Sequence, residues 1–139
     1  MKRLIAILLL VLPIPVFADN IFSGSVALGS DYIWRGQTQN NGNYALSGGL
    51  EASLGSVTLG TWASHVDFQD EANFEYDLYV NVYHDINDTF GVSAGYQHVR
   101  WDKGYDPLNE AYIGVRIGDL GVTYHQDLDN SGVKFVNVI

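Results

Sequence analysis

The chain has 139 residues, of which 16 are acidic and 7 are basic, and its formal net charge is −9. An acidic surface repels phosphate backbones, which argues against nucleic acid as a partner. The length fits one domain, and with no cysteine in the chain an exported domain would rely on strand pairing or lipid instead of disulfides.

The first residues predict a secretory signal peptide over residues 1–18. Lys2 and Arg3 precede an apolar stretch, and the small residues Val16 and Ala18 come before the expected cleavage site. A retained amphipathic anchor is the alternative, but the stretch lacks the polar face that such an anchor needs. The expected domain therefore covers residues 19–139.

An alternation of apolar and polar side chains recurs along that domain. Phe74, Tyr76 and Leu78 share one face of a segment whose other face carries Glu75 and Asp77, because successive side chains of a strand point to opposite sides. The facing of residues 57–66 is ambiguous. The expected strands cover residues 21–32, 43–54, 57–66, 74–84, 89–100, 110–117, 120–127 and 133–139.

The connections between these strands alternate in length. The connections after the second, fourth and sixth strands are short. Those after the first, third, fifth and seventh strands are longer and polar, beginning with the loop at residues 35–42. Bacterial outer-membrane barrels have this asymmetry, and segments of about ten residues can cross a bilayer when tilted. We therefore predict an all-β fold, an antiparallel up-and-down outer-membrane β-barrel of about eight strands. The sequence does not decide whether this barrel closes completely.

In such a barrel the polar faces of the strands line the interior. A net-acidic lining favours cations, and we expect Arg116 to pair with Glu51. Arg35 either constricts the entrance or pairs with Asp31. The expected pore-lining residues are Glu51, Glu75, Asp77, Gln97, Glu110 and Arg116, and the expected outer-mouth residues are Asp31, Arg35 and Asp67.

Aromatic residues gather near the expected strand ends. In a membrane barrel they would form girdles at the two interfaces with water, and in a soluble domain they would cap a core. The residues in question are Tyr32, Trp34, Phe68, Phe74, Phe90 and Trp101.

Several blocks between the first and fifth expected strands carry a family resemblance. They are Gly29-Ser-Asp-Tyr-Ile-Trp-Arg-Gly-Gln-Thr-Gln39, Gly48-Gly-Leu50, Gly60-Thr-Trp-Ala-Ser64, Val66-Asp-Phe68 and Glu75-Tyr-Asp-Leu-Tyr79. Through them the chain resembles the TorF family of porin candidates, labelled Gcw_chp among the conserved hypothetical proteins of proteobacteria. The resemblance implies an outer-membrane barrel of the porin kind. We expect a short or truncated member, because the family is usually longer and this chain ends without an aromatic residue.

Three sequence patterns suggest chemistry but lack its context. Gly91-Val-Ser-Ala-Gly95 matches a hydrolase motif that needs a strand–turn–helix elbow, yet it falls within an expected strand. Asp127-Leu-Asp-Asn-Ser-Gly132 starts like a calcium loop, but Val138 stands where the final glutamate belongs. The histidines are scattered without metal-ligand spacing. We expect no enzymatic activity, no metal and no cofactor.

The expected function is passive diffusion of small polar solutes or ions, with cations preferred, through the outer membrane of a Gram-negative bacterium. The expected partners are outer-membrane lipid, the outer-membrane assembly machinery and the solutes themselves. One alternative is a non-conducting structural or adhesion barrel, since side chains can fill an eight-stranded interior. The others are a lipid-acting barrel enzyme using Ser64 and His65, and a soluble lipocalin-like binder with its apolar faces inward.

Overall fold

The structure, a computed structural model, describes residues 21–130 and 132–139 and is built from β-strands. The predicted signal peptide lies outside the described residues. Among the described residues there is no helix long and apolar enough to cross a bilayer. The strands are β1 (Phe22–Gly29), β2 (Ile33–Trp34), β3 (Gln37–Thr38), β4 (Ala45–Leu54), β5 (Val57–His65), β6 (Phe74–Asp85), β7 (Phe90–Trp101), β8 (Leu108–Ile117), β9 (Leu120–Asp127) and β10 (Lys134–Val138).

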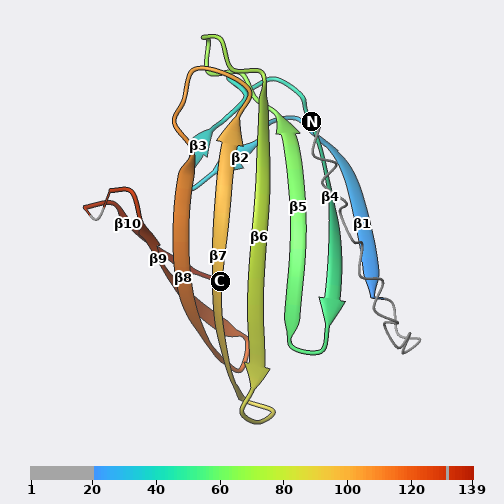
Figure 1. The fold of residues 1–139 in the computed structure, drawn as a ribbon, viewed down its shortest axis with the longest axis vertical. Coiled ribbons are helices and arrows are strands. Elements are labelled where there is room, and N and C mark those ends of the chain that lie inside the picture. Colours follow the sequence, from blue (N-terminus) through green and yellow to red (C-terminus); the bar gives the residue numbers. More distant parts are fainter. Residues whose placement is uncertain (1–20, 131) are drawn as a thin grey trace, which may run out of the picture.

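Eight of these strands form one antiparallel sheet in the order β1-β4-β5-β6-β7-β8-β9-β10. The sheet curves along its width, and β2 and β3 form a separate hairpin within the connection from β1 to β4 (Figure 1). The predicted all-β class and up-and-down order of eight strands are confirmed. The sheet does not close, because β1 and β10 are its two edges and do not pair with each other.

The main difference from the predicted strands lies in residues 30–42. The first strand ends at Gly29, and part of the expected loop at residues 35–42 instead belongs to the β2–β3 hairpin. Arg35 and Gly36 both have positive φ angles, of 51° and 79°. Two successive left-handed residues are typical of the tight type I′ turn, which joins paired strands directly.

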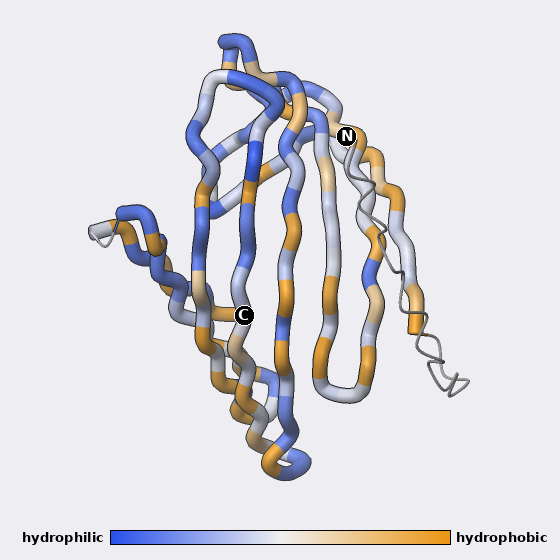
Figure 2. The backbone as a smooth tube through the Cα atoms, in the orientation of Figure 1, coloured by the Kyte–Doolittle hydropathy of each residue, from blue (hydrophilic) through white to orange (hydrophobic). Residues whose placement is uncertain are grey.

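The two faces of the sheet differ in polarity. On the outer face, Leu50 is 66% exposed and Leu78 is 59% exposed, whereas Glu75 and Glu110 on the inner face are only 3% and 1% exposed. Figure 2 shows hydrophobic and hydrophilic residues alternating along the strands. The predicted facing is confirmed: apolar side chains cover the outside and polar ones the inside. In β5, whose facing was ambiguous, Trp62 faces inward and lines a cavity on the inner face.

Glycines on the inner face accommodate the rings of tyrosines from neighbouring strands. Gly60 is the cross-strand partner of Tyr79, and Gly95 is the partner of Tyr112. A Cβ atom on either glycine would overlap the tyrosine ring, and on Gly95 it would also lie 2.6 Å from the carbonyl oxygen of Val80. Aromatic rings over strand glycines fix strand register. These glycines therefore let large polar rings fit inside a narrow curved sheet.

We predict that Gly95→Ala lowers the free energy of unfolding by about 1 to 3 kcal/mol, as is usual for overpacked interior sites. The cause is that the added methyl group would press on the backbone of β6, which cannot rotate away as a side chain can. Gly121→Ala is the control, because nothing lies within 4 Å of its added Cβ. Denaturant unfolding of both variants in detergent measures the difference, and equal stabilities would contradict the packing described here.

Candidate functional site

The β2–β3 hairpin lies against the inner face of the sheet. Its base is held by Asn40, which is fully buried and whose Nδ2 donates to the carbonyl oxygens of Asn43 and Tyr44 at 2.9 and 2.7 Å. The hydroxyl of Thr38 donates to Asp31 at 2.8 Å. These local bonds turn the chain inward, so that Tyr32, just before the hairpin, reaches β6 and Arg35, at its tip, reaches β8.

Arg35, at the tip of the hairpin, forms an ion pair with Glu110 of β8. Its two terminal nitrogens donate to the two carboxylate oxygens at 2.8 and 2.5 Å, a two-pronged contact that fixes the guanidinium plane. Gln97 of β7 also donates to Glu110, at 2.8 Å. The guanidinium carbon lies 4.2 Å from the ring centre of Trp34 and 4.4 Å from that of Phe135 in β10. Arg35 thus joins the hairpin to β8 and to the edge strand β10.

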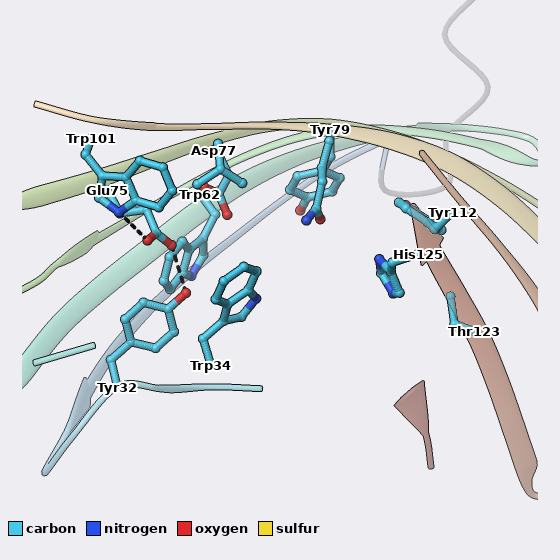
Figure 3. Close-up of a pocket in the computed structure, with 12 residues that line it drawn as sticks. Tyr32, Trp34, Trp62, Glu75, Asp77, Tyr79, Trp101, Tyr112, Thr123 and His125 are labelled. Atoms are coloured by element: carbon cyan, nitrogen blue, oxygen red, sulfur yellow. Dashed lines mark hydrogen bonds between the residues drawn. The ribbon is translucent and has the colours of Figure 1, made fainter. Parts of the chain in front are cut away.

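Glu75 of β6 is a second point of attachment for the same segment. The Tyr32 hydroxyl donates to one oxygen of Glu75 at 2.8 Å, and the indole N–H of Trp101 donates to the other at 2.8 Å (Figure 3). Burial, together with the negative charge of Glu75, raises the pKa of the Tyr32 hydroxyl far above its usual range. Tyr32 therefore stays protonated and remains a donor to the carboxylate.

A cavity of about 480 Å³ opens between the hairpin and the inner face. Glu75 and Asp77 supply its carboxylates, and Asp77 Oδ1 is buried without a hydrogen-bond partner among the described residues. Figure 3 shows that side chains of the hairpin region and of the sheet surround this space. Its aromatic walls are Tyr32, Trp34, Trp62, Tyr79, Trp101 and Tyr112.

The structure places all the expected lining residues on the inner face but does not bring them all together. Glu75, Asp77 and Gln97 line the cavity, and Gln97 bonds to Glu110 beside it. Glu51 accepts a hydrogen bond from Tyr79 at 2.6 Å and borders the same region from β4. Arg116 lies apart, nearer the short turns, because it pairs in register with Gly91 close to the start of β7.

The expected pair between Arg116 and Glu51 is wrong. Arg116 instead forms an ion pair with Asp85 at 2.6 Å. The register explains this: Asp85 pairs with Gly91 and Gly91 with Arg116, so the two charges lie in one row across the strands. Glu51 belongs to a different row, which runs through Gly60, Tyr79 and Gln97 to Glu110.

The alternative in which Arg35 pairs with Asp31 is also wrong, because Arg35 reaches Glu110 and Asp31 accepts from Thr38. Asp67, the third expected mouth residue, lies in the β5–β6 connection, accepts from Asn43 at 3.3 Å and donates its backbone N–H to the carbonyl of Gln39. Asp67 thus supports the base of the hairpin, whereas Arg35, at the tip of the hairpin, contacts Glu110 on the inner face of the sheet.

Three of the aromatic residues expected at membrane interfaces face inward instead. Tyr32, Trp34 and Trp101 line the cavity. Phe74 and Phe90 are exposed on the outer face, and Phe68 packs edge-on against Tyr105 between two connections. Sequence reasoning also missed Trp62 and His125 as cavity residues. Continuing the strand alternation by one residue would have placed Trp101 inward, next in phase after Gln97 and Val99.

Ser64 and His65, the residues considered for lipid chemistry, do not form a catalytic pair. Ser64 is buried on the inner face and its hydroxyl donates to the backbone carbonyl of His65. The His65 ring packs edge-on against Phe74, its cross-strand partner on the outer face. The hydrolase-like motif at residues 91–95 lies inside β7 with no turn or helix at its serine.

We predict that Arg35→Met lowers the free energy of unfolding by about 2 to 4 kcal/mol, because Glu110 would remain buried without its ionic partner. The exposed cation Lys103, in the β7–β8 connection, provides the control Lys103→Met, for which we expect no measurable change. Adding Glu110→Gln to Arg35→Met should recover part of the loss. Denaturant titrations in detergent check this, and an unchanged stability for Arg35→Met would refute the role given to the pair.

A family profile described as "bacterial protein of unknown function (Gcw_chp)" matches residues 18–126 of the chain. That region contains the hairpin, the carboxylates of the cavity, and the sheet from β1 to Gln126, near the end of β9. No curated protein and no solved structure matches the chain. The chain belongs to the Gcw_chp family of bacterial proteins of unknown function.

Proposed function

We propose that the chain forms an outer-membrane β-barrel of the porin kind, through which small polar solutes or ions, and cations in preference, diffuse passively. The observation that carries this proposal is the inverted polarity of the sheet. Leucines such as Leu50 and Leu78 are exposed on the outside, while Glu75 and Glu110 are buried on the inside. A soluble sandwich needs the opposite arrangement, with its apolar faces packed together, whereas a transmembrane barrel needs this one.

The connections support the same proposal. The short turns after β4, β6 and β8 lie at one end of the sheet, and the β1–β4, β5–β6 and β7–β8 connections lie at the other (Figure 1). In outer-membrane barrels the short turns face the periplasm and the longer loops face outward. In the proposed barrel β1 closes on β10, because lipid cannot satisfy the free backbone groups of an open edge. Outer-membrane lipid and the assembly machinery are the partners this requires.

The charges of the inner face support the preference for cations. Arg35 and Arg116 are each paired with a carboxylate of their own. Further carboxylates on this face have no basic partner among the described ion pairs, so the interior carries an excess of negative charge. Fixed charge of one sign along a narrow path favours ions of the opposite sign. These further carboxylates include Glu51, Glu75 and Asp77.

The position of the hairpin favours a second candidate function, a non-conducting structural or adhesion barrel. Tyr32, Trp34 and Arg35 lie over the inner face, where they line two cavities. An eight-stranded barrel has an interior that side chains alone can fill. If the hairpin stays in place, the barrel would anchor loops at the cell surface without passing solutes. Conductance separates the two candidates.

We predict that Leu50→Arg, in the middle of β4, destabilises the protein in lipid vesicles by about 2 to 4 kcal/mol, because an outward arginine there would meet hydrocarbon. Leu54→Arg is the matched control on the same strand and face. It lies at the strand end, where the cost of a charge falls to about 0 to 1 kcal/mol. Urea unfolding in vesicles measures both. Similar small effects for both variants would contradict a membrane location, because exposed leucines in water tolerate arginine.

Conductance across a planar bilayer tests the transport proposal. We expect the purified protein to open steps of conductance, with a reversal potential in a salt gradient that indicates cation preference. Glu51→Gln removes an exposed inner-face charge and should reduce that preference, while Asp119→Asn, in the exposed β8–β9 turn, should leave it unchanged. A folded, inserted protein without conductance would overturn the porin proposal and favour the structural barrel.

A further inference from the structure

Two neighbouring sites on the inner face combine aromatic rings with carboxylates. The first is the site around Arg35, where Glu110 binds the guanidinium and the rings of Trp34 and Phe135 lie within 4.4 Å of it. Aromatic faces attract cations through their quadrupole, most strongly when water is excluded. In this site, then, the chain binds one of its own cations between a carboxylate and two rings.

The second site is the cavity that contains Glu75 and Asp77, on the other side of Trp34. Trp34 lines both this cavity and the neighbouring one, which Arg35 also lines. Like the Arg35 site, the cavity combines aromatic rings with carboxylate groups, but no lysine or arginine of the described residues lines it. None of the ion pairs in the described part of the chain includes Glu75 or Asp77.

The hydrogen bonds to the carboxyl groups of the cavity come from neutral donors. Glu75 accepts from Tyr32 and Trp101. Asp77 is two residues further along the same face, and its Oδ1 is buried without a hydrogen-bond partner among the described residues. A buried carboxylate oxygen without a donor is costly, and a charge without a partner more so. A positively charged group placed beside Asp77 would therefore offset both costs.

We infer that this cavity binds an organic cation, an alkylammonium or quaternary ammonium compound, with its charge beside Asp77 and its alkyl groups against Trp62 and Trp34. The volume of about 480 Å³ falls within the range of about 300 to 1,000 Å³ that is usual for small-molecule sites. A neutral sugar could stack on the rings but would leave the carboxylates uncompensated. A small inorganic ion would gain little from the tryptophans and would keep its water.

This inference rests on the proposed function for the route by which the solute arrives, and it adds the chemical class of the solute. The cavity lies on the inner face, which the proposed barrel would enclose. A cation bound between the rings and carboxylates near the hairpin would stay in the barrel longer than an ion that does not bind. Binding to the cavity can nevertheless be measured without any transport.

Titration of the folded chain in detergent, followed by tryptophan fluorescence and by calorimetry, tests the inference. The probe is choline, and the matched neutral probe is 3,3-dimethyl-1-butanol, which has the same shape without the charge. Potassium chloride at equal ionic strength controls for screening. We expect choline to bind with saturation, and the neutral probe and the salt to give no saturable change.

Two variants locate the site. Asp77→Asn should weaken choline binding by about fivefold to tenfold through loss of the charge contact, and Trp62→Leu should weaken it by about threefold to tenfold through loss of the ring. Asp119→Asn removes the same charge from an exposed turn and should leave affinity unchanged. Circular dichroism and the gel shift of unheated protein confirm that each variant is folded.

Two outcomes would overturn the inference. Equal affinity for choline and its neutral analogue would show an apolar cavity without cation selectivity, and no saturable choline binding by folded protein would show no such site. These outcomes are distinguishable from failure of the proposed function. Conductance without choline binding would retain the porin and reject the site, and choline binding without conductance would retain the site and reject the porin.

Discussion

The constraint on which the structure depends is the placement of charge on the inner face of a single sheet. Glu75 and Glu110 are almost completely buried, and a buried carboxylate is tolerated only where donors or cations reach it. The sheet itself supplies Trp101, Gln97 and, at 3.5 Å from Glu110, His125, whereas Tyr32 and Arg35 come from the connection between β1 and β4. The inward hairpin and the polarity of the sheet are thus two parts of one arrangement.

Space for that hairpin comes from small residues in the strands. Gly60 and Gly95 lie beneath the rings of Tyr79 and Tyr112, so that these rings lie along the sheet instead of standing upright in the interior. The hairpin then reaches Glu110 through Arg35 without displacing the tyrosines. A sheet with larger residues at the two glycines would have no room for both the rings and the hairpin.

The sequence predicted the sheet well, because strand alternation is a local property. The outward positions of Leu50 and Leu78 and the inward positions of Glu75 and Asp77 follow from period two alone. The pair between Arg35 and Glu110 could not be predicted in this way, because the partners are 75 residues apart. Cross-strand rows depend on register, and the sequence does not reveal register across several strands.

The cavity was missed for a related reason. Tyr32 and Trp34 precede a polar turn, so they resembled interface aromatics at a strand end. Their inward position depends on the positive φ angles of Arg35 and Gly36, which close a tight hairpin. An arginine in that conformation is uncommon, and nothing in its neighbours except the glycine signals it. Tertiary bonds to Glu75 and Glu110 stabilise a turn that local preference alone would not select.

Labels on two adjacent residues of β4 test the central claim, that the outer face meets lipid and the inner face meets water. The chain has no cysteine, so Leu50→Cys and Glu51→Cys each provide one attachment point for an environment-sensitive fluorophore in lipid vesicles. We predict that a quencher confined to lipid tails quenches the label at position 50, and that a water-soluble quencher acts on the label at position 51. Quenching of both labels by the water-soluble reagent alone would contradict the account.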